Sequence, residues 1–342
     1  MSTLLPLFHQ VSLKGNNTFG VDAQAQTFLE LTDVAQLPAL RADPLFGALP
    51  RLVLGGGSNI LLTRDFPGLV VHMGLTGIDL VGEDARVRRM RVAAGENWHG
   101  FVLWTLAQGF GGLENLSLIP GSVGAAPIQN IGAYGAEAGE LIESVSIFDF
   151  ANGEFSELSR EECGFAYRDS VFKHRLRETA VIVAVTFALS KQWQANTRYA
   201  ELAQELNVRG ISLPGPRDVS DAVIAIRQRK LPDPAQLGNA GSFFKNPLVS
   251  AAQRDALLQA NPQLVSYVQA DGKYKLAAGW LIDQCGWKGK SLGAAGVYEK
   301  QALVLVNRGA ASGAEIWQLA QAVQSDVMAR FGVQLEAEPI VI

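Results

Sequence analysis

The sequence predicts an α+β protein with more than one domain, and three observations lead to this prediction. The chain has 342 residues, a length for which two or three domains are expected. Residues 51–189 contain several short runs rich in Val, Ile and Phe, which are typical of strands, and only one clear helical pattern. Leu213–Asp218 contains two prolines and a glycine and reads as a linker, after which helical patterns become frequent. We therefore expect a domain boundary near residue 217.

The individual elements follow from apolar runs and from the residues that end them. The expected strands are Arg51–Leu62 with a glycine turn inside it, Leu69–Met73, Val87–Gly95, Leu141–Phe150, Ala180–Leu189 and Ala302–Asn307. The expected helices are Asn97–Gln108, Asp218–Leu231, Lys275–Gln284 and a helix from the capping box of Ser312 and Glu315 to Phe331. Residues 333–342 alternate as a strand does, which places Glu336 and Glu338 on the same face.

Composition and charge exclude several classes of protein. The net charge is −4 and the pI is about 5.7, which argues against nucleic-acid binding as the main role. We find no signal peptide at the N-terminus and no apolar run long enough to span a membrane. The two cysteines, Cys163 and Cys285, do not suggest a disulfide framework, so we expect a cytoplasmic protein.

Several segments match a known motif except at one required position. The segment "GGGSN" (residues 55–59) has Ile60 where a dinucleotide-binding fingerprint needs its third glycine. A phosphate-binding loop ending in "GWKGKS" would need a glycine where Gln284 stands, and "PGSVG" has Pro120 in the first position of a nucleophile elbow. No HExxH or paired CxxC segment occurs, so we predict no metal site. Ordinary turn chemistry remains the alternative for each of these glycines.

The long segment between Gly111 and Gly139 has little regular period, yet it is apolar and glycine-rich, so we expect a functional loop rather than disorder. Small side chains let backbone N–H groups reach a phosphate, and Gln129 and Asn130 can read the edge of a heterocycle. Two such backbone nests suit a cofactor that contains a pyrophosphate. The candidate cofactor residues are Gly55, Gly56, Gly57, Ser58, Asn59, Pro120, Gly121, Ser122, Gly124, Gln129, Asn130 and Gly132.

A set of segments in register along nearly the whole chain resembles one known family. The segments are "NTFG" (17–20), "GGGSN", "AGENWH" (94–99), "GLENLSLIPGSVGAAPIQNIGAYG" (112–135), "YRDS" (167–170), "KLPDP" (230–234), "GNAGSFFKNP" (238–247), "KLAAGWLIDQ" (275–284) and "LEAEP" (335–339). Together they resemble the UDP-N-acetylenolpyruvoylglucosamine reductase (MurB) family, in its longer type with a tyrosine-bearing lid insertion near Tyr199.

The resemblance implies a fold, a cofactor and a reaction. It implies an FAD-binding part of the vanillyl-alcohol-oxidase type, with subdomains at 1–75 and 76–217, and an α+β substrate-binding domain at 218–332. Residues 333–342 would return as a strand to the first subdomain. The reaction implied is NADPH-driven reduction, through bound FAD, of the enolpyruvyl group of a UDP-sugar, by a protein that is a monomer.

The resemblance also assigns three catalytic residues, and each suits the chemistry. Hydride addition to an enol ether that bears a carboxylate builds up negative charge, which the fork of Arg168 would stabilise in bidentate fashion. Glu338 matches the second electrostatic residue, and Ser242 matches the donor of the proton to carbon. Taken alone, Arg168 could instead form a surface ion pair with Asp169, Ser242 could be a turn residue, and Glu338 could lie on a solvated face.

The sugar nucleotide would be held by a less securely matched set of residues: Tyr199, Arg227, Lys230, Asn246 and Lys288. Arg227 and Lys230 share a helical face and could hold a diphosphate of the substrate or of NADPH, although a solvated helix edge is the alternative. Pro339 follows Glu338 and cannot donate to a ladder, so its strand must be an edge or have that side free.

Two other functions remain open on the sequence. An oxidase of the same fold would pass hydride from a sugar or hydroxy acid to FAD and would need no NADPH site. A non-catalytic flavin- or nucleotide-binding module would explain the glycine loops, but not the set of Arg168, Ser242 and Glu338.

Overall fold

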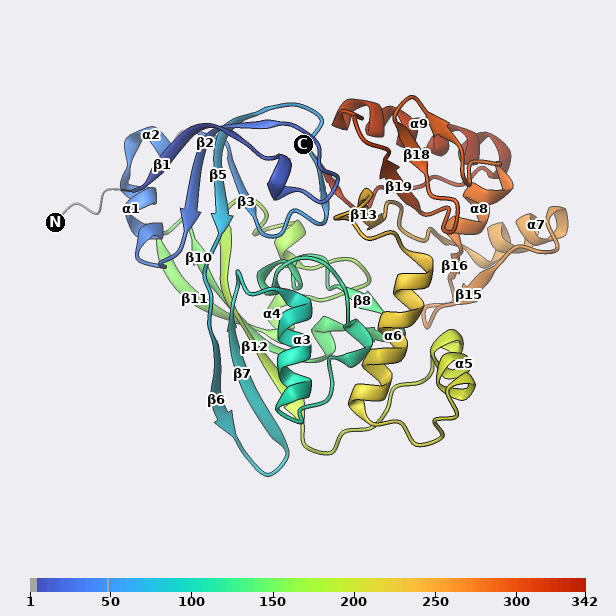
Figure 1. The fold of residues 1–342 in the computed structure, drawn as a ribbon, viewed down its shortest axis with the longest axis horizontal. Helices are drawn as coiled ribbons and strands as arrows, with labels where there is room; N and C mark the ends of the chain where they lie inside the picture. Colours follow the sequence, from blue (N-terminus) through green and yellow to red (C-terminus); the bar gives the residue numbers. More distant parts are fainter. Residues whose placement is uncertain (1–4, 48) are drawn as a thin grey trace. The chain divides into compact units, whose positions relative to one another are not determined.

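A computed structural model describes residues 5–47 and 49–342, and its contacts divide the chain into two compact units. The first unit is made of Met1–Val11, Ala25–Gly57 and Phe66–Arg229. The second unit is made of Ser12–Gln24, Ser58–Asp65 and Lys230–Ile342. The α+β prediction is confirmed, since each unit contains both helices and sheet strands (Figure 1). The N-terminal residues 1–4, on which part of the signal-peptide prediction rests, lie outside the described residues.

A four-stranded sheet opens the first unit. Its strands lie in the order β1 (Leu7–Ser12), β2 (Gln24–Leu31), β5 (Phe66–Met73) and β3 (Arg51–Leu54). β5 runs parallel to both β2 and β3, and most of it is buried, as expected of a strand with neighbours on both sides. Two short helices, α1 (Gln36–Ala42) and α2 (Pro44–Gly47), lie between β2 and β3 in the chain.

A five-stranded antiparallel sheet forms the larger part of the first unit. Its strands lie in the order β11 (Glu154–Ser159), β10 (Ile142–Asp149), β12 (Ala180–Ser190), β7 (Val87–Ala93) and β6 (Ile78–Glu83). β12 is the central strand and is buried over almost its whole length, which explains its unbroken apolar sequence. The predicted strands within this sheet are confirmed to within a few residues.

Helix α3 (Trp98–Ala107) covers this sheet through aromatic side chains. Asn97 caps its first turn by accepting from the Gly100 N–H at 2.8 Å, and the helix lies within the predicted range of Asn97–Gln108. The rings of Trp98 and Phe101 lie 6.0 and 5.1 Å from the ring of Phe187 on β12. Burial of three large rings at one point fixes α3 on the sheet and so fixes the loop that precedes it.

The long loop predicted to be functional contains only short elements. These are the 3₁₀ turns η2 (Glu114–Leu116), η3 (Val123–Ala125) and η4 (Ala138–Glu140), and the paired strands β8 (Gly132–Ala133) and β9 (Ala136–Glu137). Helix α4 (Arg160–Cys163) and the 3₁₀ turn η5 (Val171–Lys173) follow later in the chain. The loop is well buried despite its irregular backbone, as expected of an ordered apolar segment.

Two helices complete the first unit: α5 (Ala200–Val208) and α6 (Pro216–Lys230). Buried leucines of α5 pack on Val219, Val223 and Ile226 of α6. Because of this packing the two units divide between Arg229 and Lys230 rather than near residue 217, and α6 begins at Pro216, inside the predicted linker. The three-domain assignment that the family resemblance implies stays a prediction.

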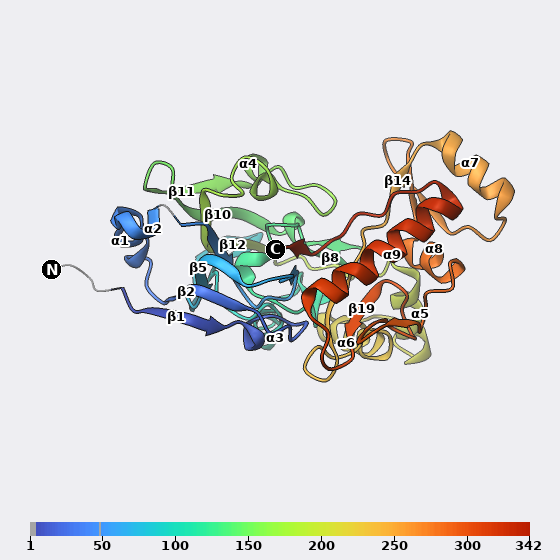
Figure 2. The same cartoon turned by 90° about the horizontal axis from the view of Figure 1, so that it is seen from above.

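The second unit is built on a four-stranded antiparallel sheet in the order β13 (Gly238–Ser242), β19 (Val304–Asn307), β18 (Ala295–Val297) and β17 (Ser291–Leu292). Helix α9 (Gly313–Phe331) packs on β18 and β19 (Figure 2). The predicted capping box of Ser312 and Glu315 is confirmed, and Gly332 ends the helix in a left-handed conformation at φ +62°.

The remaining elements of the second unit are small. They are η1 (Lys14–Asn16), β4 (Ile60–Leu61), β14 (Leu248–Val249), α7 (Ala251–Ala260), β15 (Ser266–Val268), β16 (Tyr274–Leu276), α8 (Ala278–Gln284) and β20 (Ile340–Val341). The helix predicted over Lys275–Gln284 is wrong at its start, because Lys275 pairs with Leu248 in a three-stranded sheet and α8 begins at Ala278.

The C-terminal segment pairs at two places: Ala337 forms an antiparallel bridge with Phe244, and Ile340 and Val341 lie parallel to Ile60 and Leu61 of β4. Pro339 precedes this ladder, so its missing N–H breaks no hydrogen bond, in agreement with the expectation for this proline. Among residues 5–47 and 49–342, no helix combines the length and the apolar character needed to cross a membrane.

Candidate active site

The two predicted glycine nests lie against each other in the first unit. A Cβ on Gly55 would stand 2.3 Å from Oγ of Ser122, and a Cβ on Gly56 would stand 3.1 Å from Cα of Gly121. Gly57 and Gly121 have φ values of +58° and +116°, which side chains rarely adopt. Glycine at these positions therefore allows the close approach of the two loops and their positive φ values, as the sequence analysis expected of a cofactor cradle.

Gly124 has a different reason to be glycine. A Cβ on this residue would stand 2.5 Å from Cβ of Ala94, and the Gly124 N–H donates to the Ala94 carbonyl at 2.8 Å. The N–H of Val123 likewise donates to the Glu96 carbonyl at 2.9 Å. These two amides fasten the loop to the end of β7, and the predicted contact of Gly124 with a cofactor stays a prediction.

Asn130 was predicted to form hydrogen bonds with the edge of a heterocycle, but its side-chain amide already forms hydrogen bonds with other residues of the protein. Its Nδ2 donates to Oε2 of Glu137 at 2.7 Å and to the carbonyl of Ala166 at 3.1 Å, and its Oδ1 accepts from the Gly139 N–H at 2.8 Å. Asn130 is buried and has a φ of +45°. Both amide hydrogens are used, so the geometry favours a holding role for this side chain over the predicted contact.

Arg168 occupies a tight turn in the first unit. The N–H of Ala166 donates to the Asp169 carbonyl at 3.0 Å, and the N–H of Asp169 donates back to Ala166 at 3.2 Å. Arg168 has a φ of +54°, a conformation that costs a side-chain-bearing residue about 1–2 kcal/mol. Its Nη2 donates to the carbonyl of Gly132 at 2.9 Å, and its guanidinium lies 5.3 Å from the ring centre of Tyr167.

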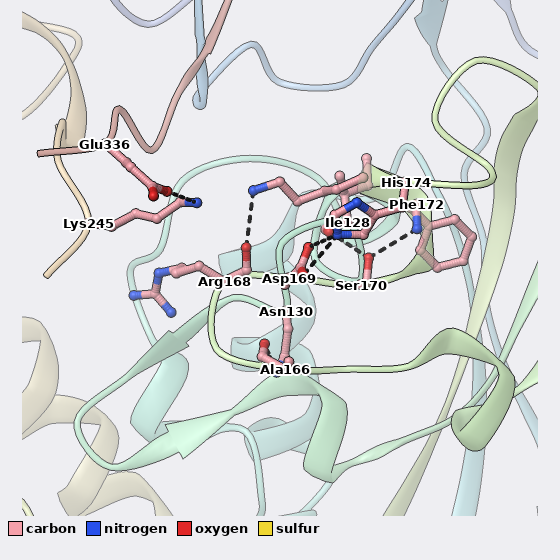
Figure 3. A network of polar contacts seen from close by, with 11 residues as sticks. Ile128, Asn130, Ala166, Arg168, Asp169, Ser170, Phe172, His174, Lys245 and Glu336 are labelled. Atoms are coloured by element: carbon pink, nitrogen blue, oxygen red, sulfur yellow. Dashed lines mark hydrogen bonds and ion pairs between the residues drawn. The ribbon is translucent and has the colours of Figure 1, made fainter. Parts of the chain in front are cut away.

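The alternative of an ion pair between Arg168 and Asp169 finds no support. Nε2 of His174 lies 2.8 and 2.9 Å from the two carboxylate oxygens of Asp169. Burial acts to raise the pKa of Asp169, but the hydrogen bond and charge of His174 outweigh it and hold that pKa below its usual value. Figure 3 shows the Arg168 side chain pointing away from Asp169 and Ser170.

Ser242 and Glu338, far apart in the sequence, are joined through the backbone of the second unit. Ser242 ends β13 and pairs with Val304 after an irregularity at Gly241, whose φ is +69°. The next residue, Phe243, accepts the N–H of Glu338 at 2.8 Å. Phe243 and Phe244 are fully buried, so they anchor the segment from which Ser242, itself only half-buried, reaches outward.

The end of the chain is fixed from a second side by Asn59. Its Nδ2 donates to the carbonyl of Glu338 at 3.3 Å, and its own carbonyl accepts the Ile340 N–H at 3.0 Å. Glu336, predicted to share a face with Glu338, is exposed and pairs with Nζ of Lys245 at 3.1 Å (Figure 3). Glu338 is half-buried, which sets it apart from the solvated face that was its alternative.

Tyr199 and Arg227 meet around Tyr134, a residue that the sequence analysis did not single out. The rings of Tyr134 and Tyr199 lie 5.2 Å apart, edge to face, and Tyr134 has a φ of +49°. Burial raises the pKa of Tyr134 to about 12, although the charge of the nearby Arg227 acts to lower it. Nε of Arg227 is buried and has no hydrogen-bond partner among the described residues, so a solvated helix edge is wrong for Arg227.

The other predicted substrate residues lie in the second unit. Lys230 ends α6 and is half-buried. Oδ1 of Asn246 accepts the N–H of Ala278 at 2.9 Å and so caps the start of α8. Nζ of Lys288 lies 3.6 Å from Oδ2 of Asp283, an exposed ion pair on the surface. Asn246 and Lys288 thus each have a partner within the protein, and their contact with a ligand stays a prediction.

Comparison with known proteins places the chain in a family. Residues 233–342 match the model for the UDP-N-acetylenolpyruvoylglucosamine reductase C-terminal domain, and residues 27–159 match an FAD binding domain. A UDP-N-acetylenolpyruvoylglucosamine reductase from Paraburkholderia phymatum is 56% identical over 338 residues, which is 98% of each chain. Another from Chromobacterium violaceum is 57% identical and covers 97% of this chain and 98% of its own.

A solved structure agrees with these sequence comparisons. The crystal structure of UDP-N-acetylenolpyruvylglucosamine reductase from Thermus caldophilus matches with a TM-score of 0.68 and 25% identity, over 99% of both chains. The fold, the two matched family models and the level of identity over the full length all agree. The chain therefore belongs to the UDP-N-acetylenolpyruvoylglucosamine reductase (MurB) family.

Proposed function

We propose that this protein reduces the enolpyruvyl group of UDP-N-acetylglucosamine enolpyruvate to give UDP-N-acetylmuramate, with NADPH as reductant and FAD as bound cofactor. The reaction belongs to the synthesis of peptidoglycan precursors. The observation that carries the proposal is the high identity, over nearly the whole chain, to relatives that bear this name. The joined placement of Ser242 and Glu338 through Phe243 supports it independently.

The FAD would be held by the paired glycine loops. Gly56 lies close to the backbone of Gly121 and Gly55 lies close to the side chain of Ser122, so the two loops meet with small residues, which fits a pyrophosphate bound by N–H groups. A flavin bound there would supply the redox chemistry, by carrying a hydride from NADPH to C3 of the enolpyruvyl group.

Arg168 is proposed to bind the carboxylate of the enolpyruvyl group. Addition of hydride at C3 leaves negative charge at C2, which spreads into the carboxylate oxygens. A guanidinium offers two parallel donors to those oxygens and keeps its charge at every working pH. Such a fixed donor stabilises the transition state more than the ground state, because the charge on the carboxylate grows as the reaction proceeds.

Ser242 is proposed to donate the proton to C2. A serine hydroxyl is a weak acid, but the enolate that it protonates is a strong base, so proton transfer is downhill once the two groups are held together. The buried Phe243 and Phe244 hold the backbone of Ser242 in place. Glu338, fastened to the carbonyl of Phe243, is proposed as the second electrostatic residue, acting on the developing enolate.

Binding of the sugar nucleotide is proposed to involve Tyr199, Arg227, Lys230, Asn246 and Lys288. The strongest of these assignments concerns Arg227, because burial lowers the pKa of its guanidinium and its Nε has no partner among the described residues. A buried cationic donor with unused hydrogen-bonding capacity is stabilised by an anionic ligand. Tyr199 is half exposed at the start of α5, as a residue that covers a ligand would be.

The proposed setting is the cytoplasm, with the protein acting as a monomer. An oxidase of the same fold is the alternative, and one experiment separates the two. The purified protein is examined for a flavin spectrum, reduced with NADPH without air, and mixed with UDP-N-acetylglucosamine enolpyruvate. We expect NADPH to bleach the flavin and the enolpyruvyl compound to restore its colour rapidly. A colourless protein, or a reduced flavin that responds to oxygen but not to the enolpyruvyl compound, would contradict the proposal.

A further inference from the structure

The turn that carries Arg168 contains an unusual residue for its backbone. Ala166 and Asp169 exchange two backbone hydrogen bonds, so Tyr167 and Arg168 form a two-residue connection between them. Arg168 has a φ of +54°, and the third position of such a turn usually carries glycine or asparagine when φ is positive. A strained residue persists only where its surroundings over-determine its conformation, and such residues cluster at functional sites.

The surroundings hold the turn at each end. Nδ2 of Asn130 donates to the carbonyl of Ala166 at 3.1 Å, which fixes the beginning of the turn. Oγ of Ser170 donates to the carbonyl of Ile128 at 2.6 Å and accepts the N–H of Phe172 at 3.3 Å, which fixes the residue after it. Both ends are therefore tied to the long glycine-rich loop, whereas the strained residue lies between them (Figure 3).

One side chain holds the strained residue itself. Nζ of Lys173 donates to the backbone carbonyl of Arg168 at 3.0 Å. The 3₁₀ turn η5, capped by Ser170, folds the chain back so that Lys173 reaches a carbonyl five residues earlier. A charged donor makes a stronger hydrogen bond to a carbonyl than a neutral one does, so Lys173 fixes the peptide plane that follows Arg168.

From this geometry we infer that Lys173 is a positioning residue, which holds the backbone of Arg168 so that its guanidinium meets the substrate carboxylate in the productive orientation. The inference rests on the proposed function. Lys173 does not itself need to touch the substrate, because its effect passes through the φ and ψ angles of Arg168. The pair of Asp169 and His174 is a weaker tie, since 66% of the His174 side chain and 41% of the Asp169 side chain are exposed to solvent.

The test compares the two half-reactions of the holoenzyme in Lys173→Met, which keeps the length of the side chain but removes the donor. We expect reoxidation of the reduced flavin by the enolpyruvyl substrate to slow about tenfold, the loss typical of a charge-assisted hydrogen bond. Reduction of the flavin by NADPH should stay unchanged. Lys173→Arg, which keeps a cationic donor, should recover most of the rate.

The matched control is Lys191→Met. Nζ of Lys191 lies 2.7 Å from Oε1 of Glu83, so this variant removes a lysine contact of the first unit far along the chain from the turn. It should leave both half-reactions unchanged. If Lys173→Met slows both half-reactions equally, or lowers the melting temperature while the rates per folded molecule stay normal, Lys173 is a structural residue and the inference is wrong.

A double-mutant cycle decides whether Lys173 acts through Arg168. In an Arg168→Ala background, Lys173→Met should cause no further loss in reoxidation, because there is no guanidinium left to position. Equal losses in both backgrounds would overturn the inference even if the single variant is slow. A normal rate for Arg168→Ala itself would instead contradict the proposed role of Arg168, and a wild-type protein inert toward the substrate would contradict the proposed function.

Discussion

The segments that carry Arg168 and Ser242 are fixed in opposite ways. Arg168 lies in a strained turn that nearby side chains hold, all within the first unit. Ser242 lies at the end of a strand whose backbone pairs with Val304 and whose neighbour, Phe243, accepts the N–H of Glu338. The first site depends on side-chain contacts that single substitutions remove, and the second depends on backbone ladders that single substitutions rarely break.

This difference predicts which substitutions should impair each of the two segments. The Arg168 turn should lose function before it loses stability, because its ties are few and partly exposed. The segment around Ser242 should tolerate changes of side chain but not changes that push its backbone away from its neighbours, because a packed interior has no spare volume. Each of the following substitutions tests one side of this comparison.

The largest effect is expected from Ser242→Ala. Loss of the proton donor should slow the reoxidation of reduced flavin by the enolpyruvyl substrate about a thousandfold, within the range of general acid catalysis. Reduction by NADPH and the melting temperature should be unchanged, because the backbone of β13 does not need the hydroxyl. Stopped-flow absorbance measures both steps, with Ser291→Ala on β17 as a control. Loss of both steps together would indicate a folding role.

Arg168→Lys should cost the substrate half-reaction about a hundredfold, since one fixed donor to a developing oxyanion is lost while the positive charge is kept. The dependence of reoxidation on substrate concentration separates weaker binding from slower chemistry, and we expect the limiting rate to fall. Arg89→Lys, on a residue paired with Asp84 and Glu143, is the control. A normal limiting rate with weaker binding would limit Arg168 to holding the substrate.

Gly238→Ala tests the backbone framework of the second unit. A Cβ at this position would stand 2.2 Å from the carbonyl oxygen of Phe19, a backbone atom that cannot turn aside. We expect a loss of about 1–3 kcal/mol in the free energy of unfolding, measured by chemical denaturation. Gly15→Ala is the control, because nothing lies within 4 Å of its Cβ position. Equal stabilities of the two variants would refute the close packing.

The smallest effect is expected from Asp169→Asn. The pKa of Asp169 is lowered in the folded protein, so its ionised form contributes stability above the unfolded-state pKa of about 3.9. That contribution is lost as the pH falls through the lowered pKa. Because the pair with His174 is exposed, the stability at pH 7 should fall by less than about 1 kcal/mol.

Melting temperatures between pH 2 and pH 7 provide the measurement for Asp169. The difference between the wild type and Asp169→Asn should shrink toward zero at the acidic end of this range. His174→Gln should give a similar, small change, since it removes the partner that lowers the pKa of Asp169. A difference that stays constant with pH would show that the titration of Asp169 is not involved.

Much of the fold could be predicted from local patterns. The helix after Asn97, the cap at Ser312 and the apolar runs of β10 and β12 stand where the sequence analysis expected them. The start of α8 was misplaced because Lys275 continues a helical pattern locally, yet pairs with Leu248 in a sheet. The two compact units divide between Arg229 and Lys230, and the packing of α6 on α5 that goes with this division joins residues that no local pattern connects.

The candidate site was predictable only where residue types are diagnostic. The family resemblance singled out Arg168, Ser242 and Glu338, but neither Tyr134 nor Lys173 bears a signal in the sequence. Tyr134 matters because of the φ angle and the ring contact it makes with Tyr199, and Lys173 matters because of one carbonyl that η5 brings within its reach. Asn130 carried a signal that pointed to a ligand, whereas its amide is engaged by Glu137, Ala166 and Gly139.

By itself the sequence determined the class of fold, the family and the types of residue available for catalysis. Apolar periodicity, helix caps and glycine loops can be recognised there because each depends on residues that are close together in the chain. Only the tertiary structure decided which glycines meet, which amides are already satisfied and which side chain holds the strained Arg168. Those facts depend on contacts between segments far apart in the chain, and burial together with the need to satisfy each polar group selects among them.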